Sequence, residues 1–335
     1  MSKVRTILAA ATLALLVPFG ISSHAGFVAR AEAATALPGP LVTPQWLNDH
    51  LKDVVVIDVR DNAKQLTTEP KFTAAKDGTR TLAETGGHIP GALFVDFNKI
   101  REARTVDGMK LNAMMPTKEF FEKAMDAAGL DKGSTIVIAA VGNGIESLDM
   151  ATRLFFQLKY FGEDKIAVLN GGTNGWIAGG FPVSVEAIPA KTGNWVATAE
   201  RKDILATTDD VKKAVRGGRT QLVDSRPTAQ FFGLAKSPVV LAAGHVQGAR
   251  SFPTEAASRP VGIASEFMDA DAYRAVFKQQ GIDPGRPLIS YCNTGHLASG
   301  GWFVAHEILK NKDAKLYSGS MNEWTHLKNP VVGLP

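Results

Sequence analysis

The two halves of the sequence repeat one set of short motifs in the same order. Each half has an apolar segment ending in Asp-x-Arg, a Gly-His turn, a second apolar segment with a glycine-containing loop, and a segment ending in tryptophan. The matching ranges are 55–60 with 221–226, 87–92 with 244–249, 135–144 with 287–295, and 169–176 with 317–324. Four landmarks in one order seldom arise by chance, so the chain is expected to contain two copies of one structural unit.

Helical patterns separate the apolar segments, because apolar residues recur there at intervals of three and four. These patterns cover residues 117–128, 147–160, 270–280 and 298–310. The apolar segments are continuous runs rather than alternating ones, which indicates parallel strands that are buried on both faces. The predicted fold class is α/β, with two domains that each have a small parallel sheet and helices on both faces.

The predicted boundaries give an N-terminal domain at residues 38–188 and a C-terminal domain at residues 204–335. Residues 186–204 lack clear periodicity and fit an interdomain connection. Residues 1–33 are typical of a signal peptide, because a basic start precedes an apolar run that is too short to span a bilayer. We expect cleavage after Ala33 rather than after Ala25, and a periplasmic or secreted protein.

The charge pattern argues against two classes of partner. The formal net charge is only +4, and the charged residues are scattered along the chain rather than clustered. We therefore expect no nucleic acid partner and no binding to a membrane surface. After the leader, no apolar run is long enough to span a membrane.

The chain has one cysteine, Cys292, in the stretch SYCNTGHLAS. Exported chains usually pair their cysteines, so Cys292 remains a free thiol or forms a mixed disulfide with an external redox partner. A free cysteine can also be an inert small residue in a core. Aligned on the glycine that closes each loop, Cys292 falls where the first copy has Val141, so only the second copy carries a thiol.

The position of Cys292 favours a reactive thiol. It follows an apolar strand at residues 288–291 and precedes a helical pattern that begins near Ala298. Ligands bind at the carboxyl ends of parallel strands, and a helix start favours a thiolate and bound anions. Thiols in such surroundings have lowered pKa values, so we interpret Cys292 as a nucleophile. Cysteine phosphatases use a related loop, but they need an arginine six residues after the cysteine to bind phosphate. This chain has Ala298 there, which argues against a phosphatase.

Taken together, these motifs resemble the tandem rhodanese sulfurtransferases, the family of thiosulfate and 3-mercaptopyruvate sulfurtransferases. The resemblance covers nearly all of the expected mature chain and implies that the C-terminal domain is catalytic, whereas the N-terminal copy has lost its cysteine. It further implies that Cys292 takes sulfur from a small anionic donor as a persulfide and passes it to cyanide or a thiol acceptor. No metal or organic cofactor is implied. We favour thiosulfate as the donor over 3-mercaptopyruvate, with a sulfur-carrier or binding protein without turnover as a further alternative.

The resemblance assigns substrate binding to the loop after the cysteine. Its backbone N–H groups would surround the persulfide, as in an oxyanion hole. His296 could attract an anion if it is protonated, or be an ordinary loop histidine. The predicted binding residues are Asn293, Thr294, Gly295, His296, Leu297, Ala298, Arg226 and His88.

Several of these residues have a structural alternative. The Thr294 hydroxyl is expected to bond its own backbone. The two Asp-x-Arg pairs occur in both copies, which indicates an ion pair that ties a loop to the sheet, with Arg226 the arginine expected nearer the substrate. His88 is expected mainly to orient its turn, with a cleft-facing role as the alternative.

One position departs from the family pattern. Relatives often have a second arginine in Asp-x-Arg-x-x-x-Arg, where this chain has Gln230. The missing charge leaves the identity of the donor open. Arg250 could supply it, although an arginine on the surface is the commoner outcome.

Overall fold

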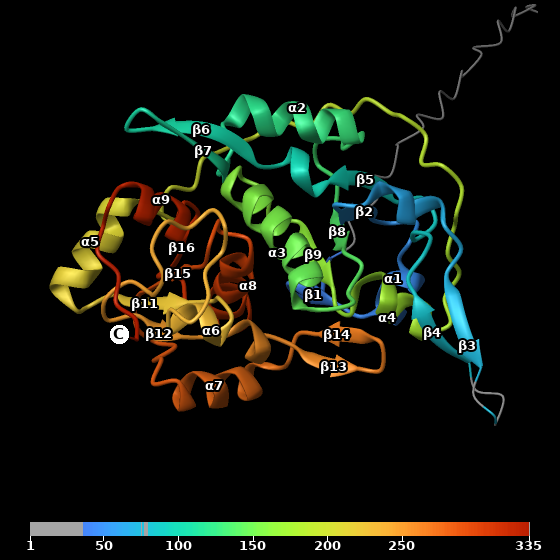
Figure 1. Ribbon diagram of the computed structural model, residues 1–335. Helices are drawn as coiled ribbons and strands as arrows, with labels where there is room; N and C mark the ends of the chain where they lie inside the picture. Colours follow the sequence, from blue (N-terminus) through green and yellow to red (C-terminus); the bar gives the residue numbers. More distant parts are fainter. Residues whose placement is uncertain (1–35, 75, 77–79, 335) are drawn as a thin grey trace, which may run out of the picture. The chain divides into compact units, whose positions relative to one another are not determined.

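The computed structural model describes residues 36–334, except residues 75 and 77–79. The predicted signal peptide and its cleavage site lie outside the described residues. Two five-stranded sheets dominate the structure, one in each half of the chain (Figure 1). Within the described residues, no helix is long and apolar enough to cross a membrane.

The first sheet has the strand order β1-β9-β8-β2-β5, and every pair of neighbouring strands is parallel. Its strands are β1 (Leu41–Val42), β2 (Val55–Arg60), β5 (Leu93–Asp96), β8 (Ile136–Ala139) and β9 (Ile166–Leu169).

Both faces of the first sheet are buried. The side chains of β8 alternate between two apolar clusters, one on each face of the sheet. Ile136 and Ile138 belong to the first cluster, and Val137 and Ala139 belong to the second. The first face packs against α2 (Lys118–Ala128) and α3 (Ile145–Tyr160). The second packs against α1 (Pro44–Asp49) and α4 (Gly172–Ala178). The continuous apolar runs in the sequence are explained by this burial on both sides.

The second half repeats this plan with the strand order β10-β16-β15-β11-β12, again all parallel. Its strands are β10 (Leu205–Ala206), β11 (Gln221–Asp224), β12 (Arg250–Ser251), β15 (Leu288–Tyr291) and β16 (Ala314–Tyr317). Helices again lie on both faces, which confirms the predicted fold class. They are α5 (Thr208–Gly217), α6 (Thr228–Phe231), α7 (Ala270–Gln279), α8 (Leu297–Phe303) and α9 (Ser320–His326), with α8 continuing into the π-helix η4 (Val304–Ile308).

The sequence patterns did not indicate the antiparallel hairpins that interrupt this plan. They are β3 (Lys71–Ala74) with β4 (Arg80–Glu84), β6 (Glu102–Val106) with β7 (Met109–Met114), and β13 (Arg259–Val261) with β14 (Ala264–Glu266). Short 3-10 turns lie at η1 (Ala63–Thr67), η2 (Phe97–Lys99) and η3 (Thr254–Ala256).

Two of these hairpins contact the opposite half of the chain. The carbonyl of Asn112 in β7 accepts a 3.2 Å hydrogen bond from Asn322 in α9. The N–H of Ser265 in β14 donates a 2.8 Å hydrogen bond to the carbonyl of Gly142 in the first half. Each half therefore sends a hairpin to the other half, β6–β7 to the start of α9 and β13–β14 to the loop after β8.

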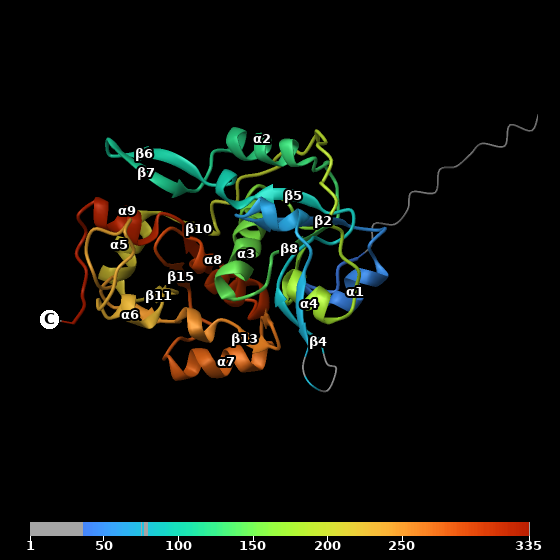
Figure 2. The ribbon, with the colours of Figure 1, turned by 45° about the vertical axis from the view of Figure 1, so that its right-hand side comes forward.

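The halves share one apolar core, in which α3 packs against α8 (Figure 2). The ring centroids of Phe155 and Phe303 lie 5.0 Å apart, and those of Phe156 and Trp302 lie 4.8 Å apart, both pairs meeting edge to face. The connection at residues 186–204 has no helix or strand. It is nevertheless packed, because Trp195 is buried with its ring 5.5 Å from that of Phe121.

Candidate functional site

Cys292 is the first residue after β15, at the carboxyl end of a central strand of the second sheet. Its side chain is buried. Its backbone is fixed on both sides, because its N–H donates to the Ser320 hydroxyl at 3.0 Å and its carbonyl accepts from Met321 N–H at 3.0 Å. The strand-to-helix turn expected from the sequence is therefore present, and the first residues of α9 hold it in place.

The strand registers correct the alignment of the two loops. Tyr291 in β15 and Ala139 in β8 pair with equivalent aspartates of the two Asp-x-Arg motifs. The next residue is Cys292 in the second half and Ala140 in the first. The structural equivalent of Cys292 is therefore Ala140, and the predicted equivalent, Val141, lies one residue farther along. Alignment on the loop glycines gives the wrong equivalent because the left-handed glycines, Gly142 and Gly295, lie two residues after Ala140 and three residues after Cys292. The conclusion that the first copy lacks the thiol is unchanged.

The loop after Cys292 has an unusual run of free donors. The backbone N–H groups of residues 293–298 have no hydrogen-bond acceptor in the described part of the chain. Gly295 has a φ of 75°, a left-handed conformation that glycine adopts without strain. Buried or half-buried N–H groups normally find an acceptor, so a run of free ones is a feature of anion sites.

Arg153 reaches this loop from α3 in the first half. Its Nη1 donates to the carbonyl of Gly295 at 3.0 Å, and its Nη2 donates to the Ser318 hydroxyl at 2.8 Å. Its Nε is buried and has no acceptor within the described residues. Burial lowers the pKa of Arg153 to about 9, Arg101 acts in the same direction, and the charge of Cys292 opposes both. The side chain is still a cation at neutral pH.

Arg101 comes from the segment between η2 and β6, also in the first half. Its guanidinium carbon lies 4.1 Å from the centre of the Phe97 ring, and that ring lies 4.6 Å from the ring of His296 in the cysteine loop. Burial lowers the pKa of Arg101, whereas the charges of Cys292 and Asp61 act in the opposite direction. Two arginines of the first half thus bring positive charge to the cysteine of the second.

His296 is neutral in the fold. Burial, followed by the charges of Arg101 and Arg153, lowers its pKa to about 3. The expectation that His296 attracts an anion as a cation is therefore wrong. Its Nε2 is buried without a partner among the described residues, so this ring can still exchange a hydrogen bond with a bound molecule.

Arg226 has a structural role. It is fully buried, its Nη2 donates to Asp224 at 2.6 Å and to the carbonyl of Gly244 at 2.8 Å, and only its Nη1 lacks an acceptor among the described residues. Arg60 makes the same contacts in the first half, to Asp58 and to the carbonyl of Gly87. The expected ion pair that ties a loop to the sheet is confirmed in both copies. The role of Arg226 as a substrate contact stays a prediction, because its buried Nη1 has no acceptor among the described residues.

His88 is also committed to its own turn. Its Nδ1 lies 3.0 Å from the carbonyl oxygen of Ile89, and its Nε2 lies 2.9 Å from that of Glu186. The ring is buried, with 4% of its surface exposed. It orients a turn of the first half, which corrects its prediction as a substrate contact.

The remaining predicted residues divide into bonded and free side chains. Asn293 donates from Nδ2 to the Gln230 side chain at 2.9 Å, so Gln230 supports the loop. The Thr294 hydroxyl makes no hydrogen bond within the described residues, contrary to the expected local bond. Leu297 begins α8, and the buried Ala298 accepts the Ser290 hydroxyl through its carbonyl at 2.9 Å.

Arg250 does not supply the missing charge. It lies in β12, and its guanidinium is beside Gly281, which follows α7. The sequence did contain a signal for Arg153, because Asp149, Arg153 and Gln157 repeat at intervals of four on one face of α3, and all three are buried. Arg101 has no such signal, because it lies in an irregular segment.

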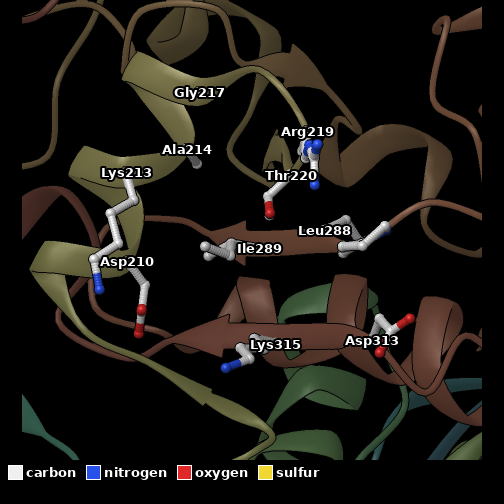
Figure 3. A pocket seen from close by; sticks show the side chains of 11 residues that line it. Asp210, Lys213, Ala214, Gly217, Arg219, Thr220, Leu288, Ile289, Asp313 and Lys315 are labelled. Carbon is white, nitrogen blue, oxygen red and sulfur yellow. The ribbon is translucent and has the colours of Figure 1, made fainter.

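A cavity of about 410 Å³ lies away from this site (Figure 3). It opens between α5 and the starts of β15 and β16, whereas Cys292 follows the end of β15. Its walls mix charges of both signs, with Lys213 and Lys315 near Asp210, and Arg219 and Asp313 farther along. This cavity contains none of the residues that surround the thiol.

A comparison with protein-family models matches the Rhodanese-like domain to two parts of the chain, residues 43–179 and 207–327. Each match covers the helices of one half and four strands of its sheet, and it begins directly after the edge strand, β1 or β10. In the described part of the chain, no group of three or more His, Cys, Asp and Glu residues could hold a metal ion.

Similar proteins cover most of the chain. A putative thiosulfate sulfurtransferase of Haloferax volcanii is 29% identical, covering 88% of this chain and 95% of its own. The sulfur carrier protein TtuD of Thermus thermophilus is 28% identical, covering 90% of this chain and 97% of its own. The crystal structure of SseA from Escherichia coli, described as a 3-mercaptopyruvate sulfotransferase, is 26% identical with a TM-score of 0.68, covering 84% of this chain and 98% of that one.

Proposed function

The chain belongs to the Rhodanese-like domain family, and on that premise we propose that it is a sulfurtransferase that carries sulfane sulfur on Cys292. One observation carries the proposal: free hydrogen-bond donors gather around a single thiol. They are the backbone N–H groups of 293–298 and the buried Nε atoms of Arg101 and Arg153, none with an acceptor in the described part of the chain. Unpaired buried donors mark a place where a ligand completes the hydrogen bonding.

The proposed reaction has two steps. In the first, the Cys292 thiolate attacks the outer sulfur of thiosulfate, a new S–S bond forms to Cys292, and the old S–S bond breaks with its electron pair leaving on sulfite. In the second, cyanide or a thiolate takes the outer sulfur and the thiolate of Cys292 is restored. The persulfide anion of the intermediate would lie among the loop N–H groups, which stabilise it as an oxyanion hole stabilises negative charge.

Thiosulfate is the proposed donor, with 3-mercaptopyruvate as the second candidate. Both are small anions, and the similar proteins include enzymes described with each donor. The buried Arg153 and the half-buried Arg101 suit a doubly charged donor, because low-dielectric surroundings strengthen the attraction of opposite charges.

A sulfur carrier without rapid turnover is the alternative. Two observations favour it: only 1% of Cys292 is exposed, and one similar protein is described as a sulfur carrier. A buried persulfide is protected from water and stray thiols, which suits storage as well as catalysis.

We further propose that the protein is exported to the periplasm or secreted. The support is the sequence of residues 1–33, with a basic start, an apolar run and small residues before the expected cleavage position. Amino-terminal sequencing of the mature protein from its native cells tests this, and an intact Met1 in the folded product would contradict it.

The decisive experiment follows sulfur on the protein. The intact protein is incubated with thiosulfate and weighed, and cyanide is then added while thiocyanate is followed over several turnovers. A gain of one sulfur atom that is absent in Cys292→Ser supports the proposal. Continued thiocyanate production indicates an enzyme, a single stoichiometric release indicates a carrier, and no sulfur gain with either donor contradicts both.

A further inference from the structure

We propose that Arg101, in the first half of the chain, binds the anionic head group of the sulfur donor at Cys292 in the second. The inference rests on the proposed function and assigns it a donor-binding residue. The group recognised is a sulfonate or carboxylate, whose oxygens can accept two hydrogen bonds from the fork of a guanidinium.

The backbone around Arg101 is held firmly on both sides. The carbonyl of the preceding residue, the fully buried Ile100, accepts a 2.6 Å hydrogen bond from Nε2 of Gln157 in α3. The carboxylate of the following residue, Glu102, accepts the N–H of Thr117 at 2.8 Å. The long side chain of Arg101 therefore starts from a fixed point, which reduces the entropy lost when it binds a ligand.

The guanidinium is also oriented. It lies over the face of Phe97, whose own ring contacts His296 in the cysteine loop. Stacking on an aromatic face occupies the flat side of a guanidinium and leaves its N–H edges for an anion. The stack therefore links Arg101 to the loop that holds the proposed persulfide.

Arg101 is the uncommitted cation at this site. Within the described residues it makes no hydrogen bond or ion pair, and its buried Nε has no acceptor. By contrast, both terminal nitrogens of Arg153 are bonded, to Gly295 and to Ser318, and Arg226 is paired with Asp224. An arginine that is partly desolvated without a partner is costly unless a ligand supplies one.

The test compares Arg101→Met and Arg101→Lys with a control, Arg104→Met. Arg104 is an exposed arginine three residues farther along, in β6, and its only hydrogen bond within the described residues is a long one, 3.5 Å, to the carbonyl of Met115. Loss of a hydrogen bond to a charged group predicts a fall in kcat/KM for the donor of about 10- to 100-fold in Arg101→Met. Arg101→Lys should lie between the wild type and Arg101→Met, and Arg104→Met should match the wild type.

Separate measurement of the two steps excludes a merely structural effect. Sulfite, the head group of thiosulfate, should inhibit Arg101→Met less strongly than the wild type. Its inhibition constant should rise by a factor similar to the fall in kcat/KM. The discharge of a preformed persulfide by cyanide should keep its wild-type rate, because no donor is bound then. Parallel assays with thiosulfate and 3-mercaptopyruvate show which head group Arg101 contacts, since the larger loss identifies it.

The proposal is overturned if Arg101→Met loads sulfur from both donors with wild-type kcat/KM, or if it slows loading and discharge equally. A wild-type protein that gains sulfur from neither donor contradicts the proposed function itself. The two failures are therefore distinguishable from each other.

Discussion

Nη1 of Arg153 in the first half donates a 3.0 Å hydrogen bond to the carbonyl oxygen of Gly295 in the cysteine loop of the second half. A Cβ atom placed on Gly295 would lie 2.5 Å from that nitrogen. The arginine therefore fits closely against a bare stretch of backbone, and the conformation of the loop depends on a side chain more than a hundred residues away in the sequence. The two copies act together although only one carries the thiol.

Substitution of Arg153 should impair the loop. In Arg153→Met the Gly295 carbonyl and the Ser318 hydroxyl lose their donor, which predicts a loss of about 1–3 kcal/mol in the free energy of unfolding. Because Arg153 positions the loop, the rate of sulfur loading should fall at temperatures where the variant is fully folded, and Arg153→Lys should recover part of it. Urea unfolding and single-turnover mass analysis measure the two effects. Wild-type loading in Arg153→Met would show that the loop keeps its conformation without this contact.

Loss of the buried arginine from either Asp-x-Arg motif should lower the free energy of unfolding by a similar amount. Arg226→Met leaves Asp224 buried without its partner, which predicts a loss of about 3–5 kcal/mol in unfolding free energy. Arg60→Met is the matched control, since it removes the same pair in the half without a thiol. Similar losses support a structural role in both. A raised KM for the donor with unchanged stability in Arg226→Met would instead support this residue as a substrate contact.

His296 predicts a pH dependence of stability. Its pKa falls from 6.5 to about 3 on folding, so the unfolded chain binds the extra proton between these values. The stabilisation is complete above pH 6.5 and is lost as the pH falls towards 3. His296→Gln, which cannot titrate, should therefore lose less unfolding free energy than the wild type between about pH 7 and about pH 4.5. Denaturant titrations at the two pH values measure this, and parallel losses in both proteins would contradict the buried neutral ring.

The sequence indicated the repeated sheets and the thiol because their signals are local. Apolar runs, Asp-x-Arg turns and the stretch around Cys292 each lie within about ten residues, where strand burial and turn chemistry determine the pattern. The hairpins were missed because their strands are short and largely exposed, as in β3 and β13, so they lack an apolar signature.

The two arginines of the site could not be predicted from local sequence patterns. The positions of Gln230 and Arg250 lie in the same half as Cys292, whereas Arg101 and Arg153 reach the thiol from the other half through tertiary packing. Nothing near Arg101 in the sequence distinguishes it from an exposed arginine such as Arg104. Only the packing of α3 on α8 brings Arg153 to the cysteine loop. The periodicity of α3 indicates that one face is buried, but it does not indicate that α8 is the element that covers it.

The first-half loop differs from the cysteine loop in more than its missing thiol. The N–H of Gly142 already donates to the Ser147 hydroxyl at 2.9 Å, and its carbonyl accepts the N–H of Ser265 at 2.8 Å. Nδ2 of Asn174 donates to the carbonyl of Ile263 in the turn of the same hairpin, at 3.0 Å. The β13–β14 hairpin therefore occupies the place that a donor would need.

Restoring a thiol to the first half should not restore sulfur loading. We expect Ala140→Cys in a Cys292→Ala background to gain no sulfur from thiosulfate, because the hairpin covers this loop and the Gly142 N–H is already bonded. Cys292→Ala alone is the control for background modification, and the wild type shows that the donor is competent. Mass analysis of the intact protein reads the result directly. A gain of one sulfur atom on the introduced thiol would mean that any thiol after a central strand of this fold suffices, and that the free donors around Cys292 are dispensable.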